Sequence, residues 1–404
     1  MRSPPLLATL ALALALCSAA PLAQAADSAS PASNPAANPA ASAATPAPRA
    51  ARPAAARPAR PAKHARAKAS PRPPVRSDAE PDAITYGSRA DAQALADTLA
   101  TQHGLDPAWA RAQLAQARYL PSVARLIMPP KAGSAKNWAA YRARFIEPER
   151  IRAGAAFWAA QAAWLDAAEQ RYGVPAAIVV GIIGVETFYG RITGQYRVLD
   201  ALATLSLGFP SGRSDRSAFF RDELGQLLAL ARREQVAPAS LKGSFAGAIG
   251  LGQFMPGSIN RFAVDFDADG HIDMAGGADK PEADVIGSVA HYLAEHGWQR
   301  GEPTHFGVLA PVDSRQRARL LLPDILPSFS AAQLAEAGAE LDSAGQAHAG
   351  PLALVELQNG DAAPSYVAGT RNFYAVTRYN WSSYYALAVI ELGQAVAAAR
   401  AAAR

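Results

Sequence analysis

The stretch GIIGVETFYG, residues 181–190, places one carboxylate, Glu186, directly after the uncharged run AAIVVGIIGV of residues 176–185. A segment without a polar face predicts a helix that is buried on all sides. Pro175 suits the first turn of this helix and Gly190 its end. Burial disfavours the charged form of a carboxyl group and raises its pKa. We therefore expect Glu186 either to have a chemical role, or to pair with an internal arginine or lie exposed at the helix end.

Helical periodicity surrounds this segment and begins at about Asp78. DAQALADTLATQHG (91–104) and DPAWARAQLAQARY (106–119) each begin with an aspartate that is a predicted N-cap, and Gly104 is a predicted helix end. The pattern continues through EPERIRAGAAFWAAQAAWLDAAEQRYG (147–173). These segments predict a mainly helical protein.

The helical periodicity of the sequence ends at about residue 303. Residues 303–378 contain short apolar runs, an Asn-Gly turn signal and further Gly and Pro, which predict a few strands and a hairpin. A final helix is expected from Trp381 onward. The predicted fold class is mainly α, or α+β, with a small β element near the C-terminal side.

The first 25 residues, MRSPPLLATLALALALCSAAPLAQA, combine one Arg, an apolar run and a small-residue ending. They predict a secretory signal that is cleaved near Ala25. Cys17 is the only cysteine and lies inside this segment, so the mature protein is expected to have no disulfide or thiolate metal site. Lipidation of Cys17 is the alternative, although Leu16 stands where such signals usually carry a small residue. No later run is expected to be long enough to span a bilayer.

Residues 26–77 form an Ala/Pro/Arg-rich segment that cannot bury a core, and we expect a disordered linker. Residues 49–76 hold nine Lys and Arg, and Asp27 is the only acid before Asp78. With these and Arg2 set aside, 29 basic and 33 acidic residues remain, a formal charge of −4. The linker either binds anionic glycan or lipid head groups or is a solvated spacer. Export disfavours nucleic acid as a partner.

The segment KGSFAGAIGLGQFMPGSINRF, residues 242–262, is rich in glycine, which lets the backbone approach a ligand or another helix closely. Gln253 brings an amide beside Phe254 and Met255. Amides hydrogen-bond to sugar hydroxyls and acetamides, and rings contact the apolar faces of sugars. The segment therefore predicts a sugar-binding loop, with helix packing as the alternative.

A calcium loop is indicated by DFDADGHID, residues 265–273. Asp265, Asp267 and Asp269 offer oxygen ligands at alternating positions, and Gly270 permits the sharp turn that follows. Three carboxylates so close together would repel each other without a cation. An Asp-rich surface turn is the alternative.

The end of this loop departs from the usual pattern, because position twelve is Gly276, where a bidentate Glu is expected. A longer loop is expected to close with Asp284, and the carbonyl of His271 adds a ligand. Less favoured closing residues are Asp279 and Glu282.

A last group of aromatic residues stands in YNWSSYYALAV, residues 379–389. Tyr379, Asn380 and Tyr385 combine rings with hydrogen-bonding tips. They either line a ligand site or pack in the core.

Four segments in order carry a resemblance to a known family: VPAAIVVGIIGVETFYGRITG, LDALATLS, LKGSFAGAIGLGQFMPGSINRFAVDFDADGHID and IGSVAHYLAEHGW. They resemble the lytic murein transglycosylases of the membrane-bound B type, also called family 3. The resemblance runs from about residue 80 to the C-terminus. It implies a helical domain, a lysozyme-like core and a small β element, together a catalytic region over residues 78–404.

The resemblance also implies an activity. Members cleave peptidoglycan between N-acetylmuramic acid and N-acetylglucosamine and leave a 1,6-anhydromuramic end without consuming water. No cofactor is implied for the chemistry, and the Asp-rich loop matches a structural calcium site. Glu186 matches the catalytic acid. The positions that line the glycan site in members correspond to Tyr141, Ser244, Gln253, Phe254, Met255, Tyr379, Asn380 and Tyr385.

Departures from the family pattern leave choices open. The segment FPSGRSDRSAFF, residues 209–220, is longer than usual, so either Arg213 or Arg216 is expected to contact substrate. One buried carboxylate suits a reaction in which the substrate supplies its own nucleophile, whereas ordinary glycosidases use two. A lysozyme-type hydrolase and a non-catalytic wall-binding protein are the alternatives.

The expected location is the periplasm, with outer-membrane association if Cys17 is lipidated. The expected partners are the glycan strands of peptidoglycan, and proteins of cell-wall synthesis or division are further candidates. Nothing in the sequence demands more than a monomer.

Overall fold

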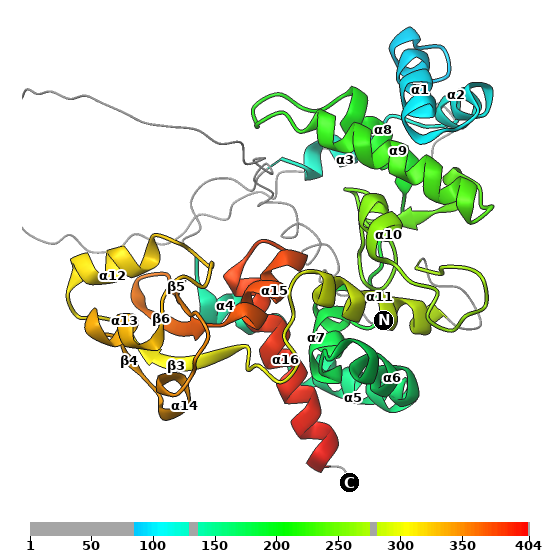
Figure 1. Cartoon of the computed structure of the whole chain (residues 1–404). Coiled ribbons are helices and arrows are strands. Elements are labelled where there is room, and N and C mark those ends of the chain that lie inside the picture. The colour runs from blue at the N-terminus through cyan, green and yellow to red at the C-terminus, as the bar shows by residue number, and fades with distance from the viewer. Residues whose placement is uncertain (1–84, 129–135, 275–280, 403–404) are drawn as a thin grey trace, which may run out of the picture. The chain divides into compact units, whose positions relative to one another are not determined.

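The computed structural model describes residues 85–128, 136–274 and 281–402 (Figure 1). The predicted signal (1–25) and linker (26–77) lie outside the described residues. Within the described residues the protein is mainly helical with a small sheet, as predicted.

Six elements pack with one another, three from the start of the described chain and three from the segment between residues 198 and 240. They are α1 (Ala90–His103), α2 (Pro107–Ala115), α3 (Pro121–Leu126), α8 (Val198–Leu207), α9 (Ser217–Arg233) and the 3-10 helix η1 (Pro238–Ser240). Asp106 caps α2, because its carboxylate accepts from the amide of Trp109 at 2.7 Å. Gly104 ends α1 with φ 63°. The predicted cap Asp91 is wrong: α1 begins after Arg89, and Asp91 lies in its first turn.

Helix α7 packs on four helices of a central group, α16, α5, α6 and α11. The central group consists of α4 (Trp138–Arg142), α5 (Pro148–Ala160), α6 (Ala162–Tyr172), α7 (Ala176–Thr187), α10 (Pro256–Phe262), α11 (Pro281–Glu295), α15 (Arg371–Tyr379) and α16 (Ser383–Ala402). The predicted segment 147–173 forms two helices, because the backbone turns at Gln161 with φ −108° and ψ 16°. A two-stranded antiparallel ribbon joins β1 (Tyr196–Arg197) to β2 (Lys242–Gly243).

Helix α7 is buried as its sequence predicts: only Ala177 and Glu186 are not fully buried. Its backbone contacts that of α16 closely. A methyl group on Gly181 would lie 2.2 Å from the carbonyl oxygen of Val389, and one on Gly393 would lie 2.1 Å from that of Ala177. Glycine is therefore required at both positions for this approach.

By length and composition α16 would suffice to cross a membrane, so the expectation that no later segment reaches that length is wrong. Half of its apolar window is buried inside the protein, where α16 packs on α5 and α7. That burial is typical of a core helix.

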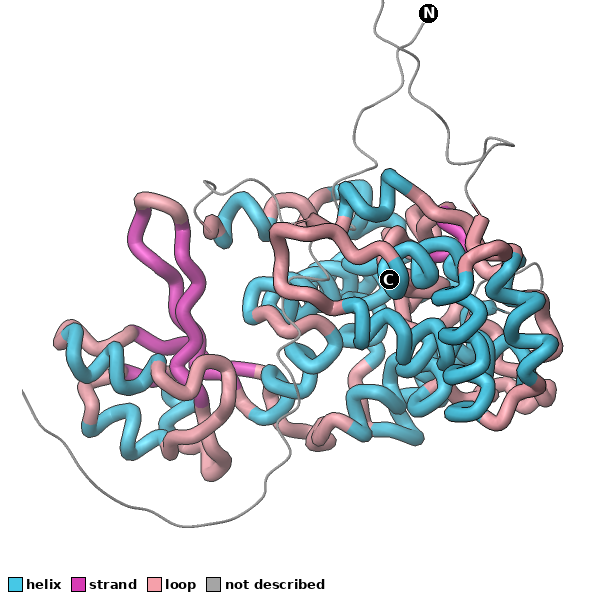
Figure 2. Tube along the Cα trace, turned by 90° about the horizontal axis from the view of Figure 1, so that it is seen from above, coloured by secondary structure: helices cyan, strands magenta, loops and turns pink. Residues whose placement is uncertain are grey.

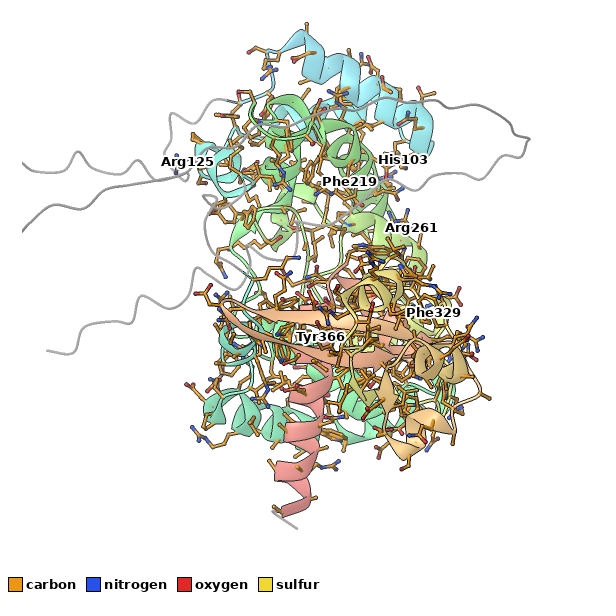
Figure 3. The ribbon with its side chains drawn as sticks, turned by 90° about the vertical axis from the view of Figure 1, so that its left-hand side faces the viewer. His103, Arg125, Phe219, Arg261, Phe329 and Tyr366 are labelled. Carbon is orange, nitrogen blue, oxygen red and sulfur yellow. The ribbon has the colours of Figure 1, made fainter. Side chains whose placement is uncertain are left out.

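The late β element contains a four-stranded antiparallel sheet in the order β4-β3-β6-β5. Its elements are β3 (His305–Leu309), α12 (Ser314–Leu321), α13 (Ala331–Glu336), β4 (Glu340–Leu341), α14 (Ser343–Gln346), β5 (Ala353–Asn359) and β6 (Ala362–Gly369). The hairpin β5–β6 is the long magenta pair in Figure 2, and its turn contains Gly360 at φ 65°. This confirms the hairpin predicted from the Asn-Gly signal. A separate small core lies here, flanked by Phe329 and Tyr366 (Figure 3).

Candidate active site

The end of α7 presents Glu186. The helix ends at Thr187, three residues before the predicted Gly190, because Phe188 and Tyr189 adopt left-handed conformations with φ 53° and 56°. The ring of Phe188 contacts the guanidinium groups of Arg150 and Arg191, at 4.4 and 4.6 Å from its centroid. These cation–π contacts hold the chain reversal directly after the acid.

The internal arginine near this helix end has another partner. Arg150 is buried, and its Nη1 donates to the carbonyl of Gly184 at 2.7 Å. It thus satisfies one of the last carbonyls of α7. Among the described residues no ion pair involves Glu186. The structure therefore disfavours the alternative in which Glu186 pairs with an arginine.

Glu186 has a hydroxyl partner instead. The phenol of Tyr385 donates to Oε1 of Glu186 at 2.7 Å. Burial raises the pKa of Glu186 to about 7, and the hydrogen bond from Tyr385 partly offsets this rise. The side chain nevertheless keeps part of its surface exposed. At neutral pH a protonated carboxyl is thus available to a molecule that approaches from solvent.

Tyrosines surround this carboxyl. The rings of Tyr379 and Tyr385 stack with centroids 6.3 Å apart, and Tyr379 donates to the carbonyl of Gly252. Burial, and then the nearby charge of Glu186, raises the pKa of Tyr141, Tyr379 and Tyr385 well above the usual value. These phenols are therefore neutral hydrogen-bond donors at physiological pH.

The glycine-rich segment folds into a loop that is fixed to the end of α7. Thr187 Oγ1 donates to the carbonyl of Leu251 at 3.0 Å. Gln253 has φ 51°, and its Nε2 donates to the carbonyls of Thr193 at 3.1 Å and Gly250 at 2.8 Å. Ser244 Oγ accepts from the amide of Ala248 at 3.0 Å. The loop is thus held rigidly against the helix that carries Glu186.

The predicted glycan-lining residues divide by exposure. Ser244 and Phe254 are only 3% exposed, and Phe254 packs against Tyr292 and Tyr379. Their burial favours a supporting role over direct sugar contact. Partial exposure is retained by Gln253, Met255, Tyr379 and Asn380. Tyr141 is 9% exposed and Tyr385 2%.

Sequence reasoning missed a contact between the hairpin and α4, the helix that carries Tyr141. Asn359 Oδ1 accepts from the amide of Ala139 at 3.2 Å, and the amide of Gly360 donates to the carbonyl of Lys136 at 2.9 Å. Tyr384 packs edge-on against Tyr141, with centroids 5.9 Å apart. The hairpin turn therefore helps to position α4 and, through it, Tyr141 beside Glu186.

The Asp-rich loop brings Asp265, Asp267 and Asp269 together, with ligand oxygens within 4.8 Å of one another. Asp265 also accepts from the amides of Asp269 and Gly270. A set of hard oxygen donors at this spacing fits calcium.

The predicted closing residue, Asp284, lies in the first turn of α11 and is buried. Its Oδ1 accepts from the amide of Phe266 at 2.7 Å and its Oδ2 from that of Asp273 at 2.8 Å. Asp284 therefore holds both ends of the loop. Glu282 shares this turn, whereas Asp279 lies outside the described residues. The ring of His271 lies near Glu234, with nitrogen and carboxylate oxygen 3.7 Å apart.

The two arginine candidates have partners elsewhere. Arg213 donates to the carbonyl of Ile127. Arg216 lies over the ring of Phe219, 4.7 Å from its centroid. The choice between them stays open.

Burial also raises the pKa of Glu223 to about 7, but Glu223 is only 3% exposed, whereas Glu186 is partly exposed. A mainly helical fold with a partly exposed carboxyl of raised pKa among phenols defines an enzyme of the general-acid, lysozyme-like class. The model of the family described as Transglycosylase SLT domain matches residues 87–394. This chain therefore belongs to the SLT-domain transglycosylase family.

Known relatives agree with this assignment. Membrane-bound lytic murein transglycosylase B of Escherichia coli (strain K12) is 41% identical over 323 residues, which cover 78% of this chain and 85% of that protein. Catenated lytic transglycosylase SltB1 of Pseudomonas aeruginosa is 39% identical with a TM-score of 0.70, covering 78% of this chain and 99% of that one. Escherichia coli Slt35 in complex with calcium is 41% identical with a TM-score of 0.66, covering 79% and 97%.

Proposed function

We propose that Glu186 is the single acid–base of this enzyme, which cleaves the glycan strand of peptidoglycan as a lytic murein transglycosylase. The observation that carries the proposal is a carboxyl with a pKa of about 7 that is hydrogen-bonded to Tyr385 and partly open to solvent. A general acid is most effective when its pKa lies near the working pH.

In the first step, neutral Glu186 protonates the glycosidic oxygen between N-acetylmuramic acid and N-acetylglucosamine, and the bond to the muramyl anomeric carbon breaks. Positive charge then develops on the muramyl ring. The substrate's own acetamide stabilises this charge as an internal nucleophile.

In the second step, the C6 hydroxyl of the muramyl residue attacks the anomeric carbon. The carboxylate of Glu186 takes the hydroxyl proton, so the enzyme returns to its starting state. The product is a 1,6-anhydromuramic end, and no water is consumed. One residue serves first as acid and then as base.

The surroundings of Glu186 support this route over hydrolysis by two carboxylates. Within the described part of the chain, the titratable groups that interact with Glu186 are Tyr141, Tyr379 and Tyr385. Phenols of raised pKa donate hydrogen bonds to sugar oxygens and do not activate water as a base.

Product masses test the proposal. Purified peptidoglycan is digested, and the soluble products are weighed by mass spectrometry. Anhydro products support the transglycosylase, whereas products heavier by one water indicate the lysozyme-type alternative. Binding to sacculi without soluble product would indicate a non-catalytic wall-binding protein.

The other functional residues follow from the same proposal. Tyr379, Asn380, Gln253 and Met255 contact the glycan, and Tyr141 and Tyr385 lie deeper at its reacting end. Asp265, Asp267 and Asp269 would hold calcium, with the carbonyl of His271 and the carboxylate of Asp284 as further ligands. Asp284 also fixes the ends of this loop. The ion would supply no chemistry and would stabilise the loop that precedes α11.

The similarity to the membrane-bound lytic murein transglycosylase B of Escherichia coli supports a location on the periplasmic side of the envelope. We propose that the chain consists of a signal over residues 1–25, a linker over 26–77 and a catalytic region over 78–404, and that it acts as a monomer. Lipidation at Cys17 is the finer alternative, tested by the mass of the mature N-terminal peptide. Cell-wall synthesis or division proteins are candidate partners.

A further inference from the structure

A hollow of about 580 Å³ is lined by residues of α2 and of the C-terminal end of α9. It is lined chiefly by Trp109 and Gln113 of α2, Arg232 of α9, and Gln235, Val236 and Pro238 of the chain that follows. None of these residues belongs to the elements that carry Glu186 or its tyrosines. Its volume is that of an ordinary small-ligand site.

The walls combine apolar surface with amides. Trp109 is partly exposed, and Val236 keeps 40% of its surface exposed beside it. The amides of Gln113 and Gln235 provide donors and acceptors at the same hollow. This pairing of an indole face with side-chain amides suits a ring that is apolar on its faces and polar at its edge.

The charge of the lining restricts the ligand further. Arg232 is its single charged side chain, and no acid lines the hollow. Its guanidinium lies 5.9 Å from the ring centroid of Trp109, so a group stacked on that ring lies close to a positive charge. The hollow therefore favours a sugar ring with a carboxylate close to it over a cationic ligand.

We infer that this hollow is a second glycan-binding site, which holds an N-acetylated sugar of the peptidoglycan strand, and a free carboxylate of the peptide stem attached to that strand, away from Glu186. The inference rests on the proposed function for the identity of the polymer. The sugar face packs on Trp109, its acetamide and hydroxyls bond to Gln113 and Gln235, and Arg232 pairs with the carboxylate. A strand that is held at this second site keeps its glycosidic bonds near Glu186, so their effective concentration at the active site rises.

The test compares an insoluble polymer with a short substrate. Arg232→Glu reverses the charge, and Gln235→Gly removes an amide while tolerating the left-handed φ of 55° at that position. Arg111→Ala is the matched control, because Arg111 is an exposed arginine on α2 that pairs with Asp97 and does not line the hollow. Melting temperatures check that each variant is folded.

For both variants, kcat/KM on intact sacculi should fall about fivefold or more, whereas kcat/KM on a soluble tetrasaccharide fragment should change by less than about twofold. The control should match the parent on both substrates. Equal losses on the two substrates, or an unchanged rate on sacculi, overturn the second site.

Failure of the proposed function has a different signature, since the parent itself would then release no anhydro product from either substrate. In that case, co-sedimentation with sacculi decides the second site. Parent and Arg111→Ala should sediment about fivefold more strongly than Arg232→Glu, and equal sedimentation overturns the inference.

Discussion

At the scale of single residues, the chemistry depends on the environment of one carboxyl. Glu186 has no cationic partner among the described residues, and its neighbours are phenols and apolar side chains. Its acidity therefore follows from desolvation and from a single hydrogen bond.

Glu186→Gln should abolish turnover, because the amide cannot donate a proton to the leaving oxygen. We expect a loss of about 10²- to 10⁴-fold in release of anhydro products, measured by chromatography of digested sacculi. Glutamine keeps the size of the side chain and accepts from Tyr385, so binding to sacculi should persist. A variant that releases product at the parental rate would show that another residue is the acid.

The same variant should affect stability in a pH-dependent way. The folded pKa of Glu186, about 7, lies above its unfolded value, so the folded state holds the proton more tightly. Stability from this group is complete below the unfolded pKa and is lost as pH rises through about 7. Glu186→Gln should therefore raise the free energy of unfolding at pH 8 by on the order of 1–3 kcal/mol. Its melting temperature should exceed that of the parent at pH 8 and should differ little from it at pH 4.

Tyr385→Phe should raise the pKa of Glu186 further, because the lost hydrogen bond favours the charged carboxylate. The alkaline limb of the kcat/KM profile should then move to higher pH. Tyr384→Phe is a matched control, since its hydroxyl bonds to the carbonyl of Gln358 and not to Glu186. A shift toward lower pH in Tyr385→Phe would contradict the assigned direction.

At the scale of elements, the acidic loop joins α10 to α11. Removal of calcium by a chelator should lower the melting temperature by several degrees, since a ligand that binds only the folded state stabilises it. Asp267→Asn and Asp269→Asn should reduce this calcium-dependent difference. Asp166→Asn, an exposed acid on α6, is the control. The products of cleavage should remain anhydro sugars, and a calcium-dependent change of product would contradict a purely structural ion.

How far the sequence predicts each element depends on the range of its contacts. The buried α7 and the Asn-Gly hairpin were predictable, because apolar composition and turn chemistry are local properties. The early end of α7 was not, because Arg150, from another helix, contacts Phe188.

The candidate site divides in the same way. The glycine-rich segment, residues 242–262, indicated a sugar-binding loop. Its sequence does not reveal that Phe254 packs inward against Tyr292 and Tyr379. The hydrogen bond from Ala139 to Asn359 joins residues 220 positions apart, so no local pattern reports it.

At the scale of the whole molecule, the folded region and the N-terminal segment carry opposite charge. A chain that lacks residues 26–77 should have the parental melting temperature and release the same products from soluble fragments. Its binding to sacculi should weaken at low salt, and this difference should vanish at high salt, because exposed charges are screened. A linker of equal length with its nine Lys and Arg replaced by Gln should behave like the deletion. Full binding by that variant would show that the charge is irrelevant.

The close contact of α7 with α16 has a consequence for how such an enzyme can vary. The proton donor stands on one of these helices and its phenol on the other, so the spacing that sets the acidity is fixed by bare backbone at Gly181 and Gly393. Even one added carbon there would act as a wedge between the two helices. Adaptation to a more acidic or more alkaline surrounding must therefore proceed through side chains around the carboxyl, while the two glycines stay as they are.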